Sequence, residues 1–148
     1  ILRCLVGSEM CIRDRYEKSI GFYSNISYTA PDYKFDLTKA NKVRMKVFVP
    51  SYNDYTTVAD VAGDWIAVNQ LQKQVAVKLQ NSAAGGSAWE TQTEIVKTNL
   101  TTDQWIELEF DFSEVKDRKD YDKIVIQFGA EGHAAPGIFF FDDFYFGE

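Results

Sequence analysis

The sequence predicts an all-β fold, an antiparallel β-sandwich of jelly-roll type. The composition favours strands, because 3 Trp, 8 Tyr and 11 Phe accompany frequent Val, Ile and Thr. No stretch repeats apolar residues at helical spacing over three turns, so we expect almost no α-helix. Alternating runs follow one another with connections of varied length, which disfavours a strand–helix–strand fold. A chain of 148 residues fits one domain with a substantial core.

The first 15 residues differ from the rest of the chain. They hold both cysteines and an apolar and basic mixture that is not repeated. The run from Leu5 to Arg15 resembles the peptide produced when a sequencing adapter is translated into a metagenomic reading frame, so we expect residues 1–15 to be a non-native leader. A signal-peptide remnant is disfavoured because no apolar segment is long enough, and a genuine edge strand is the remaining alternative. The expected domain is a single β-sandwich at residues 16–148, which lacks cysteine and therefore disulfides and thiolate metal sites.

The first half of the domain predicts two or three strands and a long connection. Residues 16–36 are rich in Tyr, Ser and Asp and predict one or two short strands. The first clear alternation covers residues 43–49, with Val and Met on one side and Arg, Lys and Phe on the other, and Pro50 ends it. Residues 51–71 form a connection too long for a hairpin. Loops of this length are usually functional or disordered, and the aromatic residues in this one argue against disorder.

The second half predicts strands at residues 74–80, 91–97, 105–112, 123–128 and 138–146. A flexible, glycine-containing turn between the first two delivers Trp89, and a glycine-rich loop between the last two holds the single histidine, His133. Trp105 opens a strand, so we expect it to pack at the edge of the sandwich. The strand at residues 74–80 alternates with Val75, Val77 and Leu79 inward. The best alternation is at residues 105–112, where the inward residues are Ile106, Leu108, Phe110 and Phe112.

The closing segment, Ile138 to Phe146, has apolar or aromatic residues on both faces, which predicts a central strand. Asp142 and Asp143 interrupt it, and a buried carboxylate is costly unless a cation or a set of donors receives it. One interpretation is a metal site. The other is a bend in the strand, with both carboxylates hydrogen-bonded to backbone N–H groups or in water.

The charge of the chain limits its partners. The net charge of −6 and the isoelectric point near 4.8 argue against nucleic acids and anionic membranes, because phosphate binding relies on clustered Lys and Arg. Neutral ligands and cations such as calcium stay open. No run of 18 apolar residues occurs, so we expect no membrane insertion.

The sequence offers little that an enzyme would need. A Ser-His-Asp triad would have to use His133, which has no nucleophile elbow nearby. Glu107, Glu109 and Asp111 share one face of a predicted strand, as catalytic residues do in some retaining glycosidases of jelly-roll fold, but they fit a solvated strand face better. No cluster of His and Cys supports zinc. We therefore expect a non-catalytic protein.

Aromatic residues in polar segments are the candidates for ligand binding. Sugar rings stack their C–H faces on indole or phenol rings, while their hydroxyl groups need polar partners. Trp65 and Trp89 both lie in polar, loop-like sequence, where each suits a ligand platform and a loop anchor equally well. Two tyrosines share the long connection with Trp65, and the histidine lies in an exposed glycine-rich setting. The candidate carbohydrate-binding residues are therefore Trp65, Trp89, Tyr52, Tyr55 and His133.

Several strand motifs together resemble a known family. They are Tyr33–Leu37, Lys42–Pro50, Val75–Leu79, Trp105–Phe112, Tyr121–Val125 and Phe140–Phe144. Their order is similar to that of the jelly-roll carbohydrate-binding modules attached to secreted glycan-degrading enzymes of marine Bacteroidetes. The resemblance implies a galactose-binding-domain-like sandwich and a non-catalytic module that binds a polysaccharide, such as the β-glucan laminarin.

The resemblance also implies a setting and a cofactor. Such modules often hold a structural calcium ion by a carboxylate of the last strand, which corresponds to Asp142 or Asp143. They are tethered to a catalytic domain in a secreted or cell-surface protein, and we expect a monomer. Related modules bind along a sheet face or at the loops of one end, and the aromatic loops here favour the second mode. Two alternatives stay open: a structural or protein-interaction sandwich, in which Trp65 and Trp89 would be buried, and a small glycan-active enzyme with two carboxylates facing one cleft.

Overall fold

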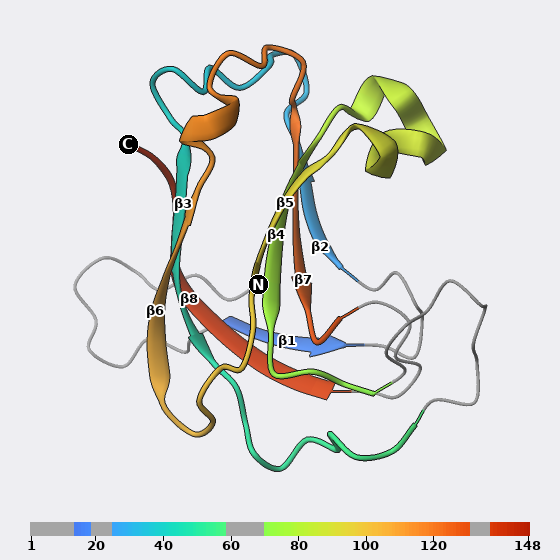
Figure 1. Cartoon of the computed structure of the whole chain (residues 1–148), viewed down its shortest axis with the longest axis vertical. Helices are drawn as coiled ribbons and strands as arrows, with labels where there is room; N and C mark the ends of the chain where they lie inside the picture. The colour runs from blue at the N-terminus through green and yellow to red at the C-terminus, as the bar shows by residue number, and fades with distance from the viewer. Residues whose placement is uncertain (1–13, 19–24, 59–69, 131–136) are drawn as a thin grey trace.

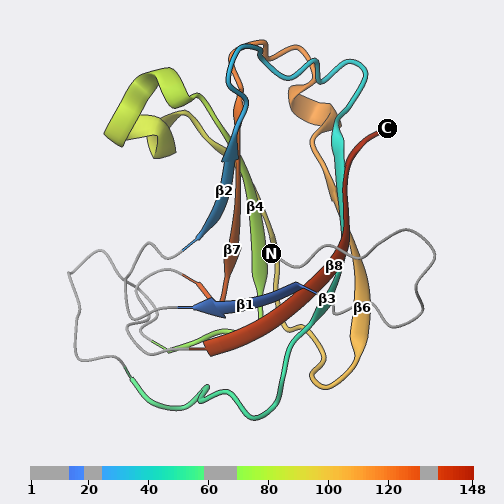
Figure 2. The ribbon, with the colours of Figure 1, turned by 180° about the vertical axis from the view of Figure 1, so that it is seen from behind.

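Two four-stranded antiparallel sheets face each other as a sandwich (Figures 1 and 2). The computed structural model describes residues 14–18, 25–58, 70–130 and 137–148. These residues contain no α-helix, and their connections hold two 3₁₀ helices, η1 (Ser82–Thr91) and η2 (Ser113–Val115), neither of which is long and apolar enough to cross a membrane. The prediction of an all-β sandwich is confirmed, whereas the jelly-roll connectivity stays a prediction.

Each sheet has two central and two edge strands. Sheet A holds, in spatial order, β1 (Asp14–Lys18), β8 (Gly137–Gly147), β3 (Lys42–Phe48) and β6 (Trp105–Asp111). Sheet B holds β2 (Ile26–Thr29), β7 (Lys123–Phe128), β4 (Val75–Gln80) and β5 (Thr93–Lys97). The strands predicted from alternation are all present, with ends that differ by a few residues.

The first strand begins inside the segment that the sequence sets apart as a leader. The backbone of β1 pairs with β8, from Asp14 opposite Phe141 to Lys18 opposite Gly137. The last two residues of the expected leader, Asp14 and Arg15, therefore belong to an edge strand of sheet A. Residues 1–13 lie outside the described residues, and their non-native origin stays a prediction.

The core lies between the sheets and follows the alternation of the strands. On β3, Val43, Met45 and Val47 are at most 1% exposed. Phe128 of β7 stacks on Phe139 of β8 with ring centroids 5.0 Å apart, so this aromatic pair joins the two sheets. Each fully buried side chain of this size contributes about 1.5–3 kcal/mol relative to its exposed state.

The closing strand β8 is central, as predicted, because it pairs with β1 on one side and β3 on the other. Its pairing with β3 shifts between Arg44 and Lys46, where one residue of β3 faces two of β8. The extra residue falls at Asp143 and Phe144, and Asp143 has a φ of 52°. This arrangement is a β-bulge. The acidic pair therefore lies at a bend in the strand, whereas the metal interpretation stays a prediction.

Candidate functional site

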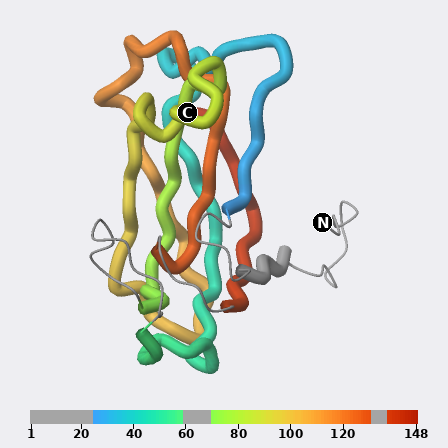
Figure 3. Tube along the Cα trace, turned by 90° about the vertical axis from the view of Figure 1, so that its right-hand side faces the viewer, coloured from blue at the N-terminus to red at the C-terminus, as the bar shows by residue number. Residues whose placement is uncertain are grey.

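The candidate site is the side of sheet B that faces away from sheet A, which we name the outer face (Figure 3). Strand register places Lys78 of β4 opposite Glu94 of β5 on one side and Val125 of β7 on the other. Successive side chains of a strand point to opposite faces. Since Val77 and Leu79 belong to the core, Lys78 and its two cross-strand neighbours lie on the outer face.

The polar residues at the centre of the outer face are buried. Lys78, Gln80 and Gln127 are 4%, 6% and 3% exposed, although residues of these types are mostly exposed in proteins. Lys78 Nζ lies 3.0 Å from Oε2 of Glu94, and Gln80 Nε2 donates to Oε1 of Gln92 at 2.8 Å. Polar groups at this depth cost free energy unless each finds a partner. The outer face therefore differs from an ordinary solvated strand face, whose polar side chains need only water as a partner.

Amide groups on this side are incompletely hydrogen-bonded. Within the described ranges, the buried side-chain atoms without any hydrogen-bond partner are Oδ1 of Asn25 and Nε2 of Gln127. The pairing of Ile26 with Ile126, continued by one residue, places Asn25 opposite Gln127. An unmet buried donor or acceptor costs about 1–3 kcal/mol, and its presence in a native structure calls for a reason. A hydroxyl group donates and accepts, so a ligand rich in hydroxyl groups would suit both atoms once the side chains that cover them move aside.

The segment η1 leaves the end of β4 and projects on the side of sheet B away from sheet A (Figures 1 and 2). It carries Trp89, which is 62% exposed, next to Ala88, which is 4% exposed. A loop anchor would bury its ring, so the exposure of Trp89 fits the interpretation as a ligand platform. The predicted flexible turn is built from 3₁₀ pieces, which Gly85 separates with a φ of 58°.

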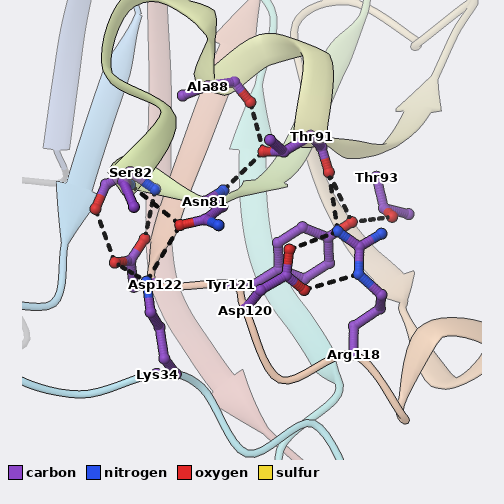
Figure 4. A network of polar contacts seen from close by, with 11 residues as sticks. Lys34, Asn81, Ser82, Ala88, Thr91, Thr93, Arg118, Asp120, Tyr121 and Asp122 are labelled. Atoms are coloured by element: carbon purple, nitrogen blue, oxygen red, sulfur yellow. Dashed lines mark hydrogen bonds and ion pairs between the residues drawn. The ribbon is translucent and has the colours of Figure 1, made fainter.

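A buried carboxylate holds the base of η1 (Figure 4). Asp122, just before β7, is 6% exposed. Its Oδ1 accepts the backbone N–H of Ser82 at 2.7 Å, and its Oδ2 accepts the Ser82 hydroxyl at 2.7 Å and the Lys34 ammonium at 2.6 Å. Burial alone would raise the pKa of Asp122, but the bonds from Lys34 and Ser82 outweigh it and lower the pKa to about 2. This carboxylate is therefore ionised throughout the neutral range.

The two tyrosines of the long connection lie far from Trp89. The part of this connection that follows β3 is at the opposite end of the sandwich from η1 (Figure 1). Tyr52 is 66% exposed there, whereas Tyr55 packs against the core and its hydroxyl donates to a backbone carbonyl at 2.7 Å. The structure does not bring these tyrosines together with Trp89, and Tyr55 stabilises its own loop.

The acidic pair of β8 makes local contacts. The N–H of Asp143 donates to Oδ1 of Asp142 at 2.8 Å, and Oδ2 of Asp143 lies 2.9 Å from Nζ of Lys46. In the part of the chain that the structure describes, no three His, Cys, Asp or Glu gather as a metal site. A calcium ion at Asp142 or Asp143 stays a prediction, which thermal melts with added calcium would test.

The polar outer face was not predicted from the sequence. The apolar residues of β4 lie in the core, as predicted, but no role was predicted for Lys78 and Gln80, which alternate with them. An outward residue is buried only where its strand is central and neighbouring side chains cover it. The order of strands in a sheet is not visible in one alternating run. The available signal was weak: a charged residue and an amide inside an otherwise apolar strand.

Comparisons with known proteins add no further residues. The chain matches no family model, no curated protein and no solved structure. The geometry alone defines the candidate site, in which the Trp89 turn and the outer face of sheet B lie on one side of the molecule. The other two predicted site residues, Trp65 and His133, lie outside the described residues.

Proposed function

We propose that this chain is a non-catalytic carbohydrate-binding module whose glycan lies on the outer face of sheet B beside Trp89. The observation that carries the proposal is an exposed indole on the same side as a polar sheet face with unpaired amide atoms. Glycans present both matching surfaces, because their C–H faces stack on aromatic rings and their hydroxyl groups bond to amides and charged groups. The proposed site therefore combines one loop with a sheet face, whereas the sequence favoured loops alone.

A neutral glycan is the favoured ligand class. The net charge of −6 disfavours polyanionic chains. Lys78, the central cation of the outer face, is already paired with Glu94. The resemblance of the strand motifs to Bacteroidetes modules supports a β-glucan such as laminarin. It also supports a place beside a catalytic domain in a secreted protein.

The carboxylates of β6 support a binding role for the domain over a catalytic one. Glu109 Oε2 lies 2.8 Å from Nε of Arg44, and Asp111 accepts the backbone N–H of Ser113 at 2.8 Å. These contacts lie in sheet A and its connection to η2. They stabilise strand pairing and a turn, which supports the solvated-face interpretation of Glu109 and Asp111.

Isothermal titration tests the proposal against laminarin, mixed-linkage glucan, chitin oligosaccharides, xylan and alginate. Wild type is compared with Trp89→Ala and Tyr52→Ala, because these residues have similar exposure, 62% and 66%, on segments at opposite ends of the sandwich. We expect heat with a neutral glycan and a loss of affinity of about tenfold or more in Trp89→Ala, about 1.4 kcal/mol. Tyr52→Ala should bind like wild type.

Gln127→Leu tests the sheet face separately. The substitution removes the unmet donor at similar volume, so we expect weaker glycan binding together with unchanged or higher stability. Weaker binding without a loss of stability distinguishes a ligand-binding amide from a structural one. If the folded protein gives no binding heat with any glycan of the panel, the proposal is overturned and the protein-interaction alternative is favoured. Loss of binding in Tyr52→Ala, with Trp89→Ala unaffected, would place the site at the other end.

A further inference from the structure

The turn that carries Trp89 is fastened at its first end by Asp122 (Figure 4). The Asp122 carboxylate receives two hydrogen bonds from Ser82 and one from Lys34. Lys34 Nζ also donates to Oδ1 of Asn81 at 3.2 Å, and Asn81 is the residue that caps η1. One buried anion therefore ties the first residues of η1 to the start of β7 and to the segment before β3.

The second end of the same turn is fastened through Thr91. Its hydroxyl accepts the N–H of Asn81 at 2.8 Å and donates to the carbonyl of Ala88 at 2.6 Å, so the two ends of η1 are bound to each other. The Thr91 carbonyl accepts the hydroxyl of Tyr121 at 3.0 Å and Nη2 of Arg118 at 3.4 Å. Tyr121 is fully buried, so this end also rests on the core.

Between its two ends, η1 packs little against the rest of the protein. Ala88 is its buried residue, and a Cβ placed on Gly85 or Gly86 would meet no atom within 4 Å. Trp89 itself is 62% exposed. The orientation of the indole therefore depends on where the ends of the turn are fixed, and the packing of the ring contributes little.

We propose that Asp122 is the positioning residue of the Trp89 platform. This inference rests on the proposed function, because it assigns Trp89 to the glycan. A fastened turn holds the indole in place before the glycan arrives, so less conformational entropy is lost on binding. Asp122 is buried at the base of the turn and acts through Ser82 and Lys34 without touching the ligand.

Asp122→Asn is the most informative variant. The amide keeps the shape of the carboxylate, but it has one acceptor oxygen, and its NH₂ group faces donors. The Lys34 side chain is 41% exposed and can return its ammonium to water, so we expect a folded domain with a looser η1. Asp103→Asn is the matched control, because Asp103 Oδ1 accepts the N–H of Ser51 at 2.8 Å in a loop at the other end.

A double-mutant cycle with Trp89→Ala, measured as affinity for laminarin, tests the proposal. Hydrogen–deuterium exchange of the η1 amides is the readout that needs no ligand. We expect Asp122→Asn to weaken binding about three- to tenfold and to speed exchange across η1. In the Trp89→Ala background it should cause no further loss, because no platform is left to position. Asp103→Asn should change neither affinity nor exchange.

The outcomes separate this inference from the proposed function. Equal losses of affinity in both backgrounds would overturn the positioning role, and so would unchanged exchange across η1. If Asp122→Asn does not fold, Ser82→Ala removes one hydrogen bond to the same carboxylate and replaces it in the cycle. If wild type binds no glycan, the proposed function fails, and the exchange data still decide whether Asp122 anchors the turn: faster exchange confined to η1 supports it.

Discussion

At the residue scale, two ion pairs differ in how far they are buried, so their contributions to stability can be compared directly. The side chains of Lys78 and Glu94 are 5% and 35% exposed, whereas those of Arg44 and Glu109 are 37% and 46% exposed. An ion pair that is shielded from water is worth more than an exposed one, because water weakens the attraction between exposed charges. We expect Glu94→Gln to lower the free energy of unfolding by about 1–3 kcal/mol and Glu109→Gln by less than about 1 kcal/mol. Urea denaturation measures the free energy of unfolding of both variants, and equal losses would contradict the larger contribution expected of the buried pair.

Asp122 gives stability a pH dependence whose sign follows from its lowered pKa. The pKa falls from 3.8 to about 2 on folding, so the folded protein binds this proton less readily than the unfolded chain does. The contribution is complete above about pH 5 and is lost as the pH falls towards 2. The Tm of wild type should therefore drop more steeply between pH 5 and pH 2 than the Tm of Asp122→Asn. Parallel curves would show that the carboxylate has no stabilising contacts.

At the element scale, the turn after β7 depends on a glycine. Gly129 has a φ of 86°, and a Cβ there would overlap Cδ1 of buried Leu71. Gly147 in β8 is also crowded, but its Cβ would meet the hydroxyl end of exposed Tyr145, which can swing into water. We expect Gly129→Ala to cost about 2–4 kcal/mol from backbone strain and overpacking, and Gly147→Ala less than about 1 kcal/mol. Chemical denaturation measures the loss of stability in both variants. A larger loss in Gly147→Ala than in Gly129→Ala would refute the greater constraint assigned to Gly129.

The alternation of the strands could be predicted from the sequence because it is a local property. The Val and Met side of β3 and the residues predicted to point inward in β4 are buried. Trp105 lies in the edge strand β6 and packs on Phe48 of β3, with ring centroids 5.6 Å apart. The burial of Lys78 could not be predicted, because it depends on β4 lying between β5 and β7. The form of η1 was missed for the same reason, since Asp122 lies 40 residues beyond Ser82.

At the scale of the whole molecule, aromatic side chains from both sheets meet in the core. Phe139 of β8 is fully buried and stacks on Phe128 of β7, whereas Phe144 in the bulge is 42% exposed. Phe139→Ala leaves a cavity between the sheets and should lower the free energy of unfolding by about 3–5 kcal/mol. That is a large share of the total for a typical domain, which is about 5–15 kcal/mol. Phe144→Ala should stay within about 0.5 kcal/mol. Denaturant titrations that show similar midpoints for the two variants would contradict this role of Phe139.

The central place of β8 also has a consequence for synthesis. Lys42 of β3 pairs with Gly147 of β8, so the middle of sheet A joins two strands that are far apart in the sequence. A ribosome releases β3, β6 and all of sheet B before β8 exists. Until then, one edge of β3 stays open to mispairing with other chains, and closing so long a loop is slow. Sheet A therefore cannot be completed before β8 is made, and we expect resistance to proteases to arise in one step when β8 leaves the exit tunnel.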